Sequence, residues 1–477
     1  MLEITTLIVY FSLLLAVAFF SYQKQRSDTD FVIGNRSMNF WLTALSAHAS
    51  DMSSWLFLGY PAMIFTNGLI GAWAAIGLTF FMFLNWHFIA PRIRIATEQF
   101  NSVTINAYFE SRFADRSGSI RLISAVMSIL FFTIYISSGL VALGVLVESL
   151  FNMPYTIGIT IGLLIVVVYV FMGGYRTIAW IDVFQGFFLL AVIVFIPTIL
   201  LMQIGGIHPV MNAAAAHKLS TSLFPDFSGR TLLYIILTAA GWGLGYFGQP
   251  QIITKFMGIR HVSEMNKAKW LGISWQFTAL TAATLVGLIG IYFFPSGLED
   301  PQRVILNIVQ TTLPAFFAVL VLCAILAAST NVMAAQILVV ASNLSEDFYK
   351  RILRKEATPS ELLWVSRISV LIVAVIAFVI AFFKISTIYR LVLYSWSGLG
   401  ASFGPLLLLS LYRKSINRYG AFVGILVGGL TAAIWPYIEN LYHWETPSSL
   451  VAGFILSLLS IEIVSYFTRQ RTSIKNN

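Results

Sequence analysis

The chain alternates between long apolar segments and short polar connections. An α-helix needs about 20 predominantly apolar residues to cross a bilayer, and thirteen segments approach that length. They are residues 4–22, 39–60, 69–90, 120–150, 155–172, 179–204, 231–254, 270–294, 313–345, 362–383, 389–412, 419–438 and 448–468. The pattern predicts an all-α polytopic membrane protein whose polar connections lie outside the bilayer.

The second segment carries a polar interruption, LTALSAHASDMSSW at Leu42–Trp55. An ionised Asp at mid-membrane costs roughly 2.5–3.5 kcal/mol, so Asp51 is expected to line a cavity or a pathway. Hydroxyls surround it at Ser46, Ser50, Ser53 and Ser54. Oxygen ligands suit a hard cation, and serines weaken a helix interior. The stretch therefore predicts an interrupted helix beside an ion site. Close packing of helices on small residues is the alternative, but it leaves Asp51 unexplained.

A second interruption lies at residues 241–250, GWGLGYFGQP. Several Gly residues and a Pro weaken a helix, and broken backbone at membrane depth is tolerated only beside protein or a water-filled cavity. Trp242 and Tyr246 are four residues apart and would share a helix face, which suggests a pocket for a small amphipathic solute. A Gly-rich packing face is the alternative. Two broken helices, five helices apart, are typical of transporters with inverted repeats.

Composition and charge agree with this class. The mean hydropathy is +0.83 and only 10% of the residues are charged. When alternate connections are assigned to opposite sides, 24 of the 29 Lys and Arg residues fall on one side. The positive-inside rule then predicts an external N-terminus and a cytoplasmic C-terminus in a plasma (inner) membrane. The net charge of +9 is thereby explained by topology and by contact with an anionic lipid bilayer, without nucleic acid.

The sequence gives no indication of an enzyme. The single cysteine, Cys323, can form neither an internal disulfide nor a zinc site, and the six His residues are scattered. No nucleotide-binding or hydrolase motif occurs in a plausible context, so no organic cofactor is expected. Residues 4–22 have no basic segment before them and no clear cleavage site, which indicates a retained helix rather than a signal peptide.

Four motifs resemble the sodium/solute symporter family, and they are closest to its proline-transporting members. They are SAHASDMSSW in the second segment, FFTIY at 131–135, GGYRTIAWIDVFQ at 173–185 and GWGLGYFGQP at 241–250. The resemblance runs from about Asp30 to Arg418. It implies a leucine-transporter-type fold with about thirteen helices, in which helices 2–6 and 7–11 form inverted five-helix repeats. The expected organisation is one transport domain, 1–477: an N-terminal helix and loop (1–38), repeats at 39–204 and 231–412, and C-terminal helices with a short tail (413–477).

The resemblance also assigns roles to single residues. The implied sodium ligands are the backbone carbonyls of Ala49, Met52 and Ala328, with Asn331 as a possible amide ligand. The residues implied to support ion coupling are Asp51, Ser53, Ser329 and His48. The implied substrate contacts are Tyr135, Trp242, Tyr246 and Pro250. Arg36 and Asp182 match functional residues near the cytoplasmic side, where they would take part in gating.

The ninth helix departs from the family pattern. Proline-transporting members have adjacent Ser and Thr ligands there, but alignment on AILAA at 324–328 puts Asn331 and Val332 at those positions. Asn331 offers an amide oxygen, whereas Val332 offers no ligand. Ser329 precedes Val332 by three residues, so it lies near the same face one turn away.

His48 is the second departure, because a small residue is expected there. On a continuous helix it would share a face with Asp51, three residues later, and would titrate near neutral pH. Proton coupling through this pair is therefore an alternative to sodium coupling. The other alternative is a histidine that is simply hydrogen-bonded in the core.

Taken together, the residues and the resemblance predict a secondary active symporter that imports a small amino acid, L-proline, with sodium. A symporter for another solute, such as pantothenate, a sugar or another amino acid, is the nearest rival. A channel would not need a specific solute pocket or accumulate solute. A membrane sensor would need an output domain, and the chain continues for only about ten residues beyond the last predicted helix.

Overall fold

The computed structural model describes residues 2–21, 28–151, 153–172, 174–442 and 449–473. Within these ranges the regular secondary structure is helical, and buried side chains form a continuous apolar core. Ten of the described helices are long and apolar enough to cross a membrane. The three remaining predicted spans are the apolar helices α1 and α9 and the interrupted pair α3–α4.

The helices follow the predicted order. The long elements are α1 (Leu2–Ser21), α5 (Trp73–Leu84), α8 (Ser119–Phe151), α9 (Tyr155–Met172), α10 (Tyr175–Ile204), α14 (Met265–Phe293), α16 (Ala315–Ser342), α17 (Pro359–Phe382), α18 (Ile388–Tyr412), α19 (Arg418–Tyr442) and α20 (Ser449–Ser473). The short elements are α2 (Asp28–Ile33), α6 (Ala90–Gln99), α7 (Ile105–Arg112), α11 (Ile207–Ala216) and α15 (Val304–Thr312). The π-helical turns η4 (Asn85–Ile89) and η8 (Asn343–Leu353) extend α5 and α16.

The first broken helix consists of α3 (Phe40–Ala49), the turn η2 (Ser54–Leu56) and α4 (Gly59–Asn67). The side chain of Asn39 caps α3 by accepting the amide of Leu42 at 3.0 Å. The helix ends in the serine-rich stretch, where the hydroxyl of Ser50 donates to the carbonyl of Ser46 at 2.6 Å. Such local bonds offer the backbone an alternative to the helix. The predicted interruption is therefore present, and the segment continues to Asn67 rather than ending at residue 60.

The second broken helix consists of α12 (Gly229–Gly243), the turn η5 (Leu244–Gly248) and α13 (Pro250–Gly258). Pro250 starts α13, where the missing amide hydrogen costs nothing. The glycines here allow close packing, because a Cβ at Gly245 would overlap the indole of Trp396. A Cβ at Gly248 would lie 2.7 Å from the amide nitrogen of Gly404. The break thus depends on both the Gly residues and the neighbouring helix α18.

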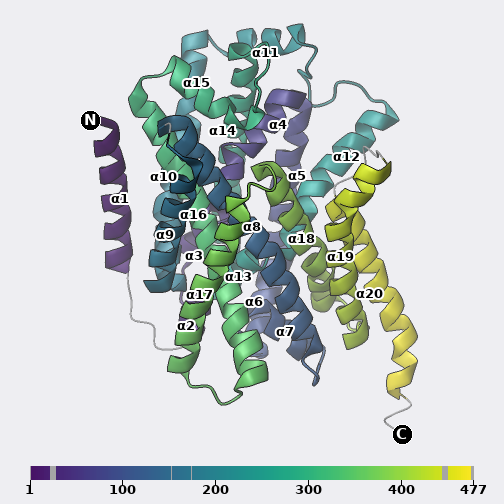
Figure 1. Ribbon diagram of the computed structural model, residues 1–477. Helices are drawn as coiled ribbons and strands as arrows, with labels where there is room; N and C mark the ends of the chain where they lie inside the picture. Colours follow the sequence, from purple (N-terminus) through teal and green to yellow (C-terminus); the bar gives the residue numbers. More distant parts are fainter. Residues whose placement is uncertain (1, 22–27, 152, 173, 443–448, 474–477) are drawn as a thin grey trace.

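The connections contain more helix than the apolar pattern indicates. The loop near 91–119 contains the end of α6 and all of α7, and the loop near 205–230 contains α11. The stretch between two predicted spans, 295–312, contains α15. These helices have ten residues or fewer, so they are too short to register as spans and lie at the ends of the bundle (Figure 1).

The two broken helices run in opposite directions through the bundle. In Figure 1, α3–α4 rises from the lower half to the top, whereas α12–α13 descends. Each opens a series of five apolar segments, the first within 39–204 and the second within 231–412. This arrangement is the one expected of inverted repeats, although the repeat boundaries stay a prediction.

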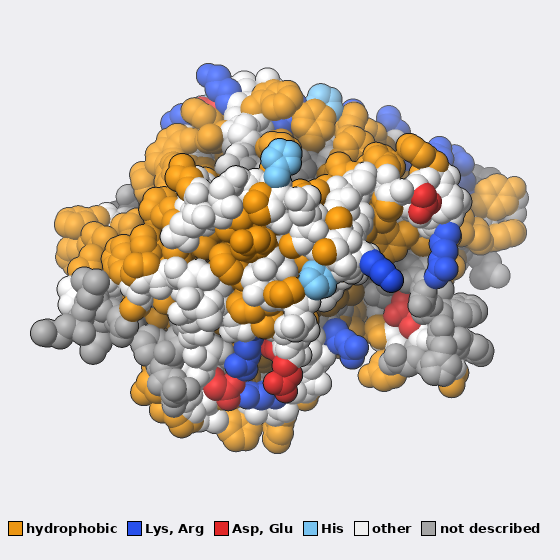
Figure 2. Space-filling model, turned by 90° about the horizontal axis from the view of Figure 1, so that it is seen from above, with side chains coloured by type: hydrophobic (Ala, Val, Ile, Leu, Met, Phe, Trp, Pro, Cys, Tyr) orange, Lys and Arg blue, Asp and Glu red, His pale blue; other side chains and the backbone are white. Residues whose placement is uncertain are grey.

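The two ends of the bundle differ in their connections. Helices α11 and α15 lie at the top of Figure 1, where α1 begins, and α2, α6 and α7 lie in the lower half, where α20 ends. The face seen from above has its charged side chains scattered among apolar and uncharged atoms rather than gathered in one patch (Figure 2). Most of the basic connections belong to the lower end.

This distribution makes the topology testable. We expect a reporter fused after Asn477 to be active only in a cytoplasmic format, because most of the basic connections lie at the end of the bundle where α20 ends. A reporter fused before Met1 should be active only outside the membrane. Paired phosphatase and fluorescent-protein fusions measure both ends, and external activity of the C-terminal fusion would contradict the predicted orientation.

Candidate functional site

A cavity at the centre of the bundle brings the two broken helices together. We call it the central cavity, and it is lined by Asp51, Met52, Ser53, Trp55, Leu78, Tyr135, Trp242, Tyr246, Val392 and Trp396. Both helix breaks contribute, as do α5, α8 and α18. Its free volume is about 20 Å³, so a solute the size of an amino acid requires its side chains to move apart.

Asp51 is the acidic group in this cavity. The hydroxyl of Tyr246 donates a short hydrogen bond to the Asp51 carboxylate, which ties the break in the first helix to the break in the second. The side-chain amide of Gln276 donates to the Tyr246 hydroxyl at 3.1 Å. Asp51 is 6% exposed, and Tyr246 and Gln276 are fully buried. The carboxylate is therefore positioned by a hydrogen-bond chain rather than by an ion pair.

Aromatic rings form most of the remaining wall. The ring centroids of Trp55 and Trp242 are 4.7 Å apart, and Tyr246 lies edge-on to Trp396 at 5.1 Å. Tyr135 completes this side of the cavity from α8. Such rings cover apolar parts of a ligand while polar edges fix its orientation.

The backbone at the first break has released two carbonyl groups from helical hydrogen bonding. In a continuous helix the amide of Ser53 would donate to the carbonyl of Ala49, but here it donates to the carbonyl of Asp51 at 3.0 Å. Likewise the amide of Leu56 donates to Ser53 at 3.1 Å instead of to Met52. The predicted ion ligands Ala49 and Met52 therefore have carbonyl oxygens that the local helical pattern does not use.

Helix α16 supplies the other predicted ion ligands and contacts both α3 and η2. Ala328, Ser329 and Asn331 are all buried. The hydroxyl of Ser329 donates to the carbonyl of Ile325 at 2.8 Å, which leaves its oxygen lone pairs available. Both amide atoms of Asn331 are buried without a hydrogen-bond partner. A buried polar group in that state costs about 1–3 kcal/mol, so a ligand for the Asn331 oxygen would be stabilising.

His48 does not pair with Asp51. The helix α3 ends at Ala49, and the two side chains have different partners, because Asp51 binds Tyr246 whereas His48 lies against Trp86. His48 is fully buried, and its Nε2 accepts a hydrogen bond from the indole of Trp86 at 3.0 Å. The imidazole stacks on that ring and lies outside the set of residues that line the central cavity.

Asp182 joins the inner parts of both broken helices. Its Oδ2 lies 2.7 Å from the Nζ of Lys255 on α13 and 2.5 Å from the hydroxyl of Ser46 on α3. The side chains of Asp182 and Lys255 are 0% and 3% exposed. This buried bridge connects α3, α10 and α13. It is separate from the central cavity, so Asp182 has a different environment from Asp51.

Arg36, in the segment before α3, connects that segment to α13 and to the end of α6. Its guanidinium donates to the carbonyl of Met257 at 3.0 Å, and to the carbonyls of Thr97 and Ser102 at the same distance. These bonds hold the segment before α3 against the end of α13 and the connection after α6. The residues predicted for gating therefore both contact α13, although from different sides.

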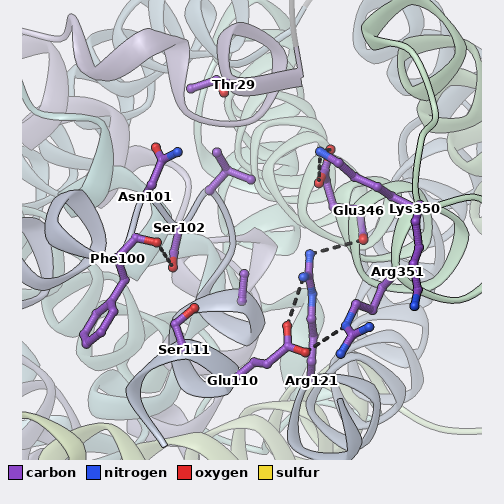
Figure 3. Close-up of a pocket in the computed structure, with 13 residues that line it drawn as sticks. Thr29, Phe100, Asn101, Ser102, Glu110, Ser111, Arg121, Glu346, Lys350 and Arg351 are labelled. Atoms are coloured by element: carbon purple, nitrogen blue, oxygen red, sulfur yellow. Dashed lines mark hydrogen bonds and ion pairs between the residues drawn. The ribbon is translucent and has the colours of Figure 1, made fainter. Parts of the chain in front are cut away.

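A polar hollow of about 460 Å³ lies next to the Arg36 contacts and includes Ser102 (Figure 3). Its floor is an ion-pair network in which Glu110 binds Arg121 at 3.1 Å and Arg351 at 2.8 Å. Arg121 also binds the buried Asp347 at 2.6 Å. The network ties α7 and α8 to η8 at the end of the bundle where the basic connections gather.

Four side chains of the site lie outside the motifs of the sequence. They are Leu78, Val392 and Trp396, which line the central cavity, and Gln276, which holds Tyr246. The indole of Trp396 also donates to the carbonyl of Trp242 at 2.9 Å. Trp55, which lines the cavity as well, lies at the end of the serine-rich stretch. Pro250, predicted as a substrate contact, is buried at the start of α13 and is not among the residues that line the cavity.

The fold and the site define a class of protein: a multi-pass membrane transporter with two broken helices around a central cavity. The family model of the sodium:solute symporter family matches residues 31–428. The chain is 39% identical over 460 residues to a high-affinity proline transporter of Bacillus subtilis, covering 96% of both chains. It is 36% identical to an osmoregulated proline transporter of the same species, covering 98% of this chain and 95% of the relative. It is 37% identical to a sodium/proline symporter of Staphylococcus aureus, covering 97% of this chain and 92% of the relative. The chain belongs to the sodium:solute symporter family.

Solved structures agree on the fold. A Na⁺-coupled sialic acid symporter superposes with a TM-score of 0.81 at 19% identity, covering 98% of both chains. A nucleobase–cation symport transporter superposes with a TM-score of 0.58 at 15% identity, covering 94% of this chain and 96% of that one. The transporter MhsT in complex with L-phenylalanine superposes with a TM-score of 0.56 at 12% identity, covering 89% of this chain and 97% of that one. The leucine-transporter-type fold is therefore confirmed.

The Asp182–Lys255 bridge makes a prediction about stability. Replacing Lys255→Met leaves a buried carboxylate without its cation, which costs about 3–5 kcal/mol, so thermal unfolding of the purified protein should begin at a clearly lower temperature. The double variant Asp182→Asn/Lys255→Met should recover part of the loss, because the uncompensated charge is gone.

Lys384→Met is the matched control, since Lys384 pairs with Glu148 at 3.5 Å at a site where both side chains are well exposed. An exposed pair contributes about 0–1 kcal/mol, so this variant should unfold near the wild-type temperature. Equal unfolding temperatures for Lys255→Met and Lys384→Met would show that the bridge is not a stabilising contact.

Proposed function

We propose that this protein is a secondary active symporter that imports L-proline together with sodium. The observation that carries the proposal is the central cavity, where Asp51 and Met52 from one helix break and Trp242 and Tyr246 from the other line the same space. The printed names of the relatives, which are proline transporters and sodium/proline symporters, support the choice of substrate and ion.

The ion ligands we propose are the carbonyl oxygens of Ala49, Met52 and Ala328 with the side-chain oxygen of Asn331. Hard cations prefer oxygen ligands, and broken helices supply such carbonyls to sodium in transporters. The unpartnered amide of Asn331 supports this assignment. Ser329 is a further candidate through its lone pairs. Asp51 and Ser53 act next to this set, and Asp51 connects it to Tyr246.

For proline we propose that the pyrrolidine ring packs against the indoles of Trp242 and Trp55, with Tyr135 and Tyr246 close to its charged groups. The aromatic walls suit an apolar ring, and hydroxyl edges suit a zwitterion. The printed names of the relatives support proline rather than pantothenate or a sugar. Movement of the two broken helices relative to α16 would widen the cavity and alternate its access.

The driving force is adequate for accumulation. One cation that enters at 100 mV releases about 2.3 kcal/mol, and a tenfold sodium gradient adds about 1.4 kcal/mol. These two sources would concentrate a neutral zwitterion by roughly 500-fold at a stoichiometry of one. In a plasma membrane, with the N-terminus outside and the C-terminus in the cytoplasm as predicted, sodium would enter the cell down its gradient and carry the solute inward.

Proton coupling through His48 and Asp51 is the second candidate. The position of His48 argues against it, because its Nε2 is engaged by Trp86 and the ring lies outside the central cavity. Sodium coupling therefore remains the proposal. His48→Ala is expected to disturb the packing around Trp86 without changing which ion gradient drives uptake.

The substrate assignment predicts that Trp242→Ala and Tyr246→Phe lower the affinity for proline. Trp242→Ala removes a ring of the wall, and Tyr246→Phe removes the hydroxyl that positions Asp51, so each should raise the apparent KM by about tenfold or more. Uptake of labelled proline into proteoliposomes measures this. Trp364→Ala, at an exposed position on α17, is the matched control. A thermal shift of the purified protein with another solute, and none with proline, would contradict the assignment.

The ion assignment predicts that Val332→Thr raises the apparent affinity for sodium. The added hydroxyl would supply a ligand that the chain lacks on α16, and the extra oxygen should lower the half-saturating sodium concentration several-fold. Val340→Thr is the matched control, because it adds the same hydroxyl at a buried position two turns further along the helix.

The measurement is uptake at fixed pH against sodium, followed by uptake at fixed sodium against pH. Sodium coupling requires that removal of sodium abolishes accumulation in the wild type. Accumulation that needs no sodium and collapses only with the proton gradient would overturn the assignment.

A further inference from the structure

A long apolar groove runs along the outside of the bundle between α5 and α14. It has a volume of about 810 Å³ and is lined on one side by Ile76 and Phe80 and on the other by Trp270 and Phe277. Helix α11 closes one end through Met211. It is separate from the central cavity and shares no lining residue with it.

The groove faces the lipid rather than the protein core. Phe80 and Phe277 are 56% and 62% exposed, although both belong to membrane-spanning helices. The lining on α14 extends from Trp270 to Leu288, a rise of about 27 Å along the helix, which is comparable to the thickness of a bilayer core. The groove is thus long enough to hold a lipid acyl chain, which spans one leaflet, about half of the bilayer core.

The chemistry of the lining also requires an apolar occupant. It contains no charged residue, and its polar side chains are threonines. The hydroxyl of Thr79 donates to the carbonyl of Ala75 at 2.8 Å, and that of Thr284 donates to Leu280 at 2.8 Å. These two threonines therefore have their hydroxyls engaged on their own helices, which leaves little for a polar ligand to bind.

One end of the groove is cationic. The Nζ of Lys269 lies 5.0 Å and 5.2 Å from the ring centroids of Phe83 and Trp270, both of which line the groove. It also lies 3.3 Å from Nδ1 of His87. Lys269 is 6% exposed, and these contacts hold its charge at this end of the groove. Lys267 lies on the other side of α14, about 200° around the helix, where its Nζ is 5.9 Å from the ring centroid of Phe40. A lysine at the end of a membrane-spanning helix attracts an anionic headgroup, so charge and apolar surface together define one kind of occupant.

We propose that this groove is a binding site for one anionic phospholipid. An acyl chain lies along the groove between Ile76 and Phe277, and the headgroup phosphate binds at Lys269. This lysine distinguishes the site from other lipid-facing surfaces, because a neutral phospholipid would fill the groove without using its charge.

The test uses the full-length protein, purified in detergent, stripped of lipid and titrated with phosphatidylglycerol or phosphatidylcholine of identical acyl chains. Native mass spectrometry counts the molecules bound. We expect the wild type to bind one phosphatidylglycerol about fivefold more tightly than phosphatidylcholine, since one lysine contributes about 1 kcal/mol near the headgroup. Lys269→Gln should remove this preference and leave acyl-chain binding intact, whereas Lys267→Gln, on the other side of α14 against Phe40, should keep it.

Two further variants fill the groove from opposite walls. Thr281→Trp is at an exposed position of α14 and Ile76→Trp is on α5, so a folding defect in one does not prevent the test with the other. Both should lose the tightly bound lipid. Ile372→Trp is the matched control, because Ile372 is 50% exposed on α17, away from the groove. It should bind lipid as the wild type does.

Three outcomes would overturn the proposal. The first is equal affinity of the wild type for the two lipids. The second is unchanged lipid binding in both Thr281→Trp and Ile76→Trp. The third is a dimer that forms in the wild type and is lost in these variants, because the groove would then be occupied by a second copy of the chain.

Discussion

A membrane interior offers no water to satisfy backbone polar groups, and the two broken helices meet this constraint in different ways. At the second break, side chains take up the freed carbonyls: Asn85 donates to Tyr246 at 2.9 Å, and Trp396 donates to Trp242 at 2.9 Å. At the first break, the carbonyls of Ala49 and Met52 are left outside the local helical pattern. One break is thus fixed by protein, while the other presents oxygens that a cation can use.

Two bridges then connect the breaks to each other. In the central cavity, the hydroxyl of Tyr246 binds Asp51, which places the proposed substrate wall in direct contact with the stretch proposed to bind the ion. Further along, Asp182 binds both Ser46 and Lys255, so the inner parts of the broken helices share one carboxylate. Because both bridges are buried, a shift of one broken helix must either carry the other with it or break a charged contact. That is a physical basis for coupling ion binding to solute binding.

The sequence was sufficient for the parts of this arrangement that depend on local chemistry. The spans, the serine-rich break around Asp51 and the Gly- and Pro-rich break before Pro250 follow from apolar length and helix propensity. Contacts between distant segments cannot be predicted from apolar length and helix propensity. Lys255 is 73 residues from Asp182, and Gln276 is 30 residues from Tyr246, and no spacing rule joins them. The pairing of His48 with Asp51 failed because each side chain has a different partner from a distant segment.

The lipid-facing groove lies closer to the central cavity than its position on the surface suggests. Thr284 lines the groove, and its hydroxyl lies 2.7 Å from the hydroxyl of Tyr60. Tyr60 stacks on Trp55 at 5.0 Å, and Trp55 belongs to the wall of the central cavity. Three side chains in a row, Thr284, Tyr60 and Trp55, therefore connect an acyl chain in the groove to the cavity. Since packed aromatic rings do not deform continuously, an occupant that restricts α14 at Thr284 also restricts the rotamers open to Trp55, and with them the ease with which the cavity widens around its solute.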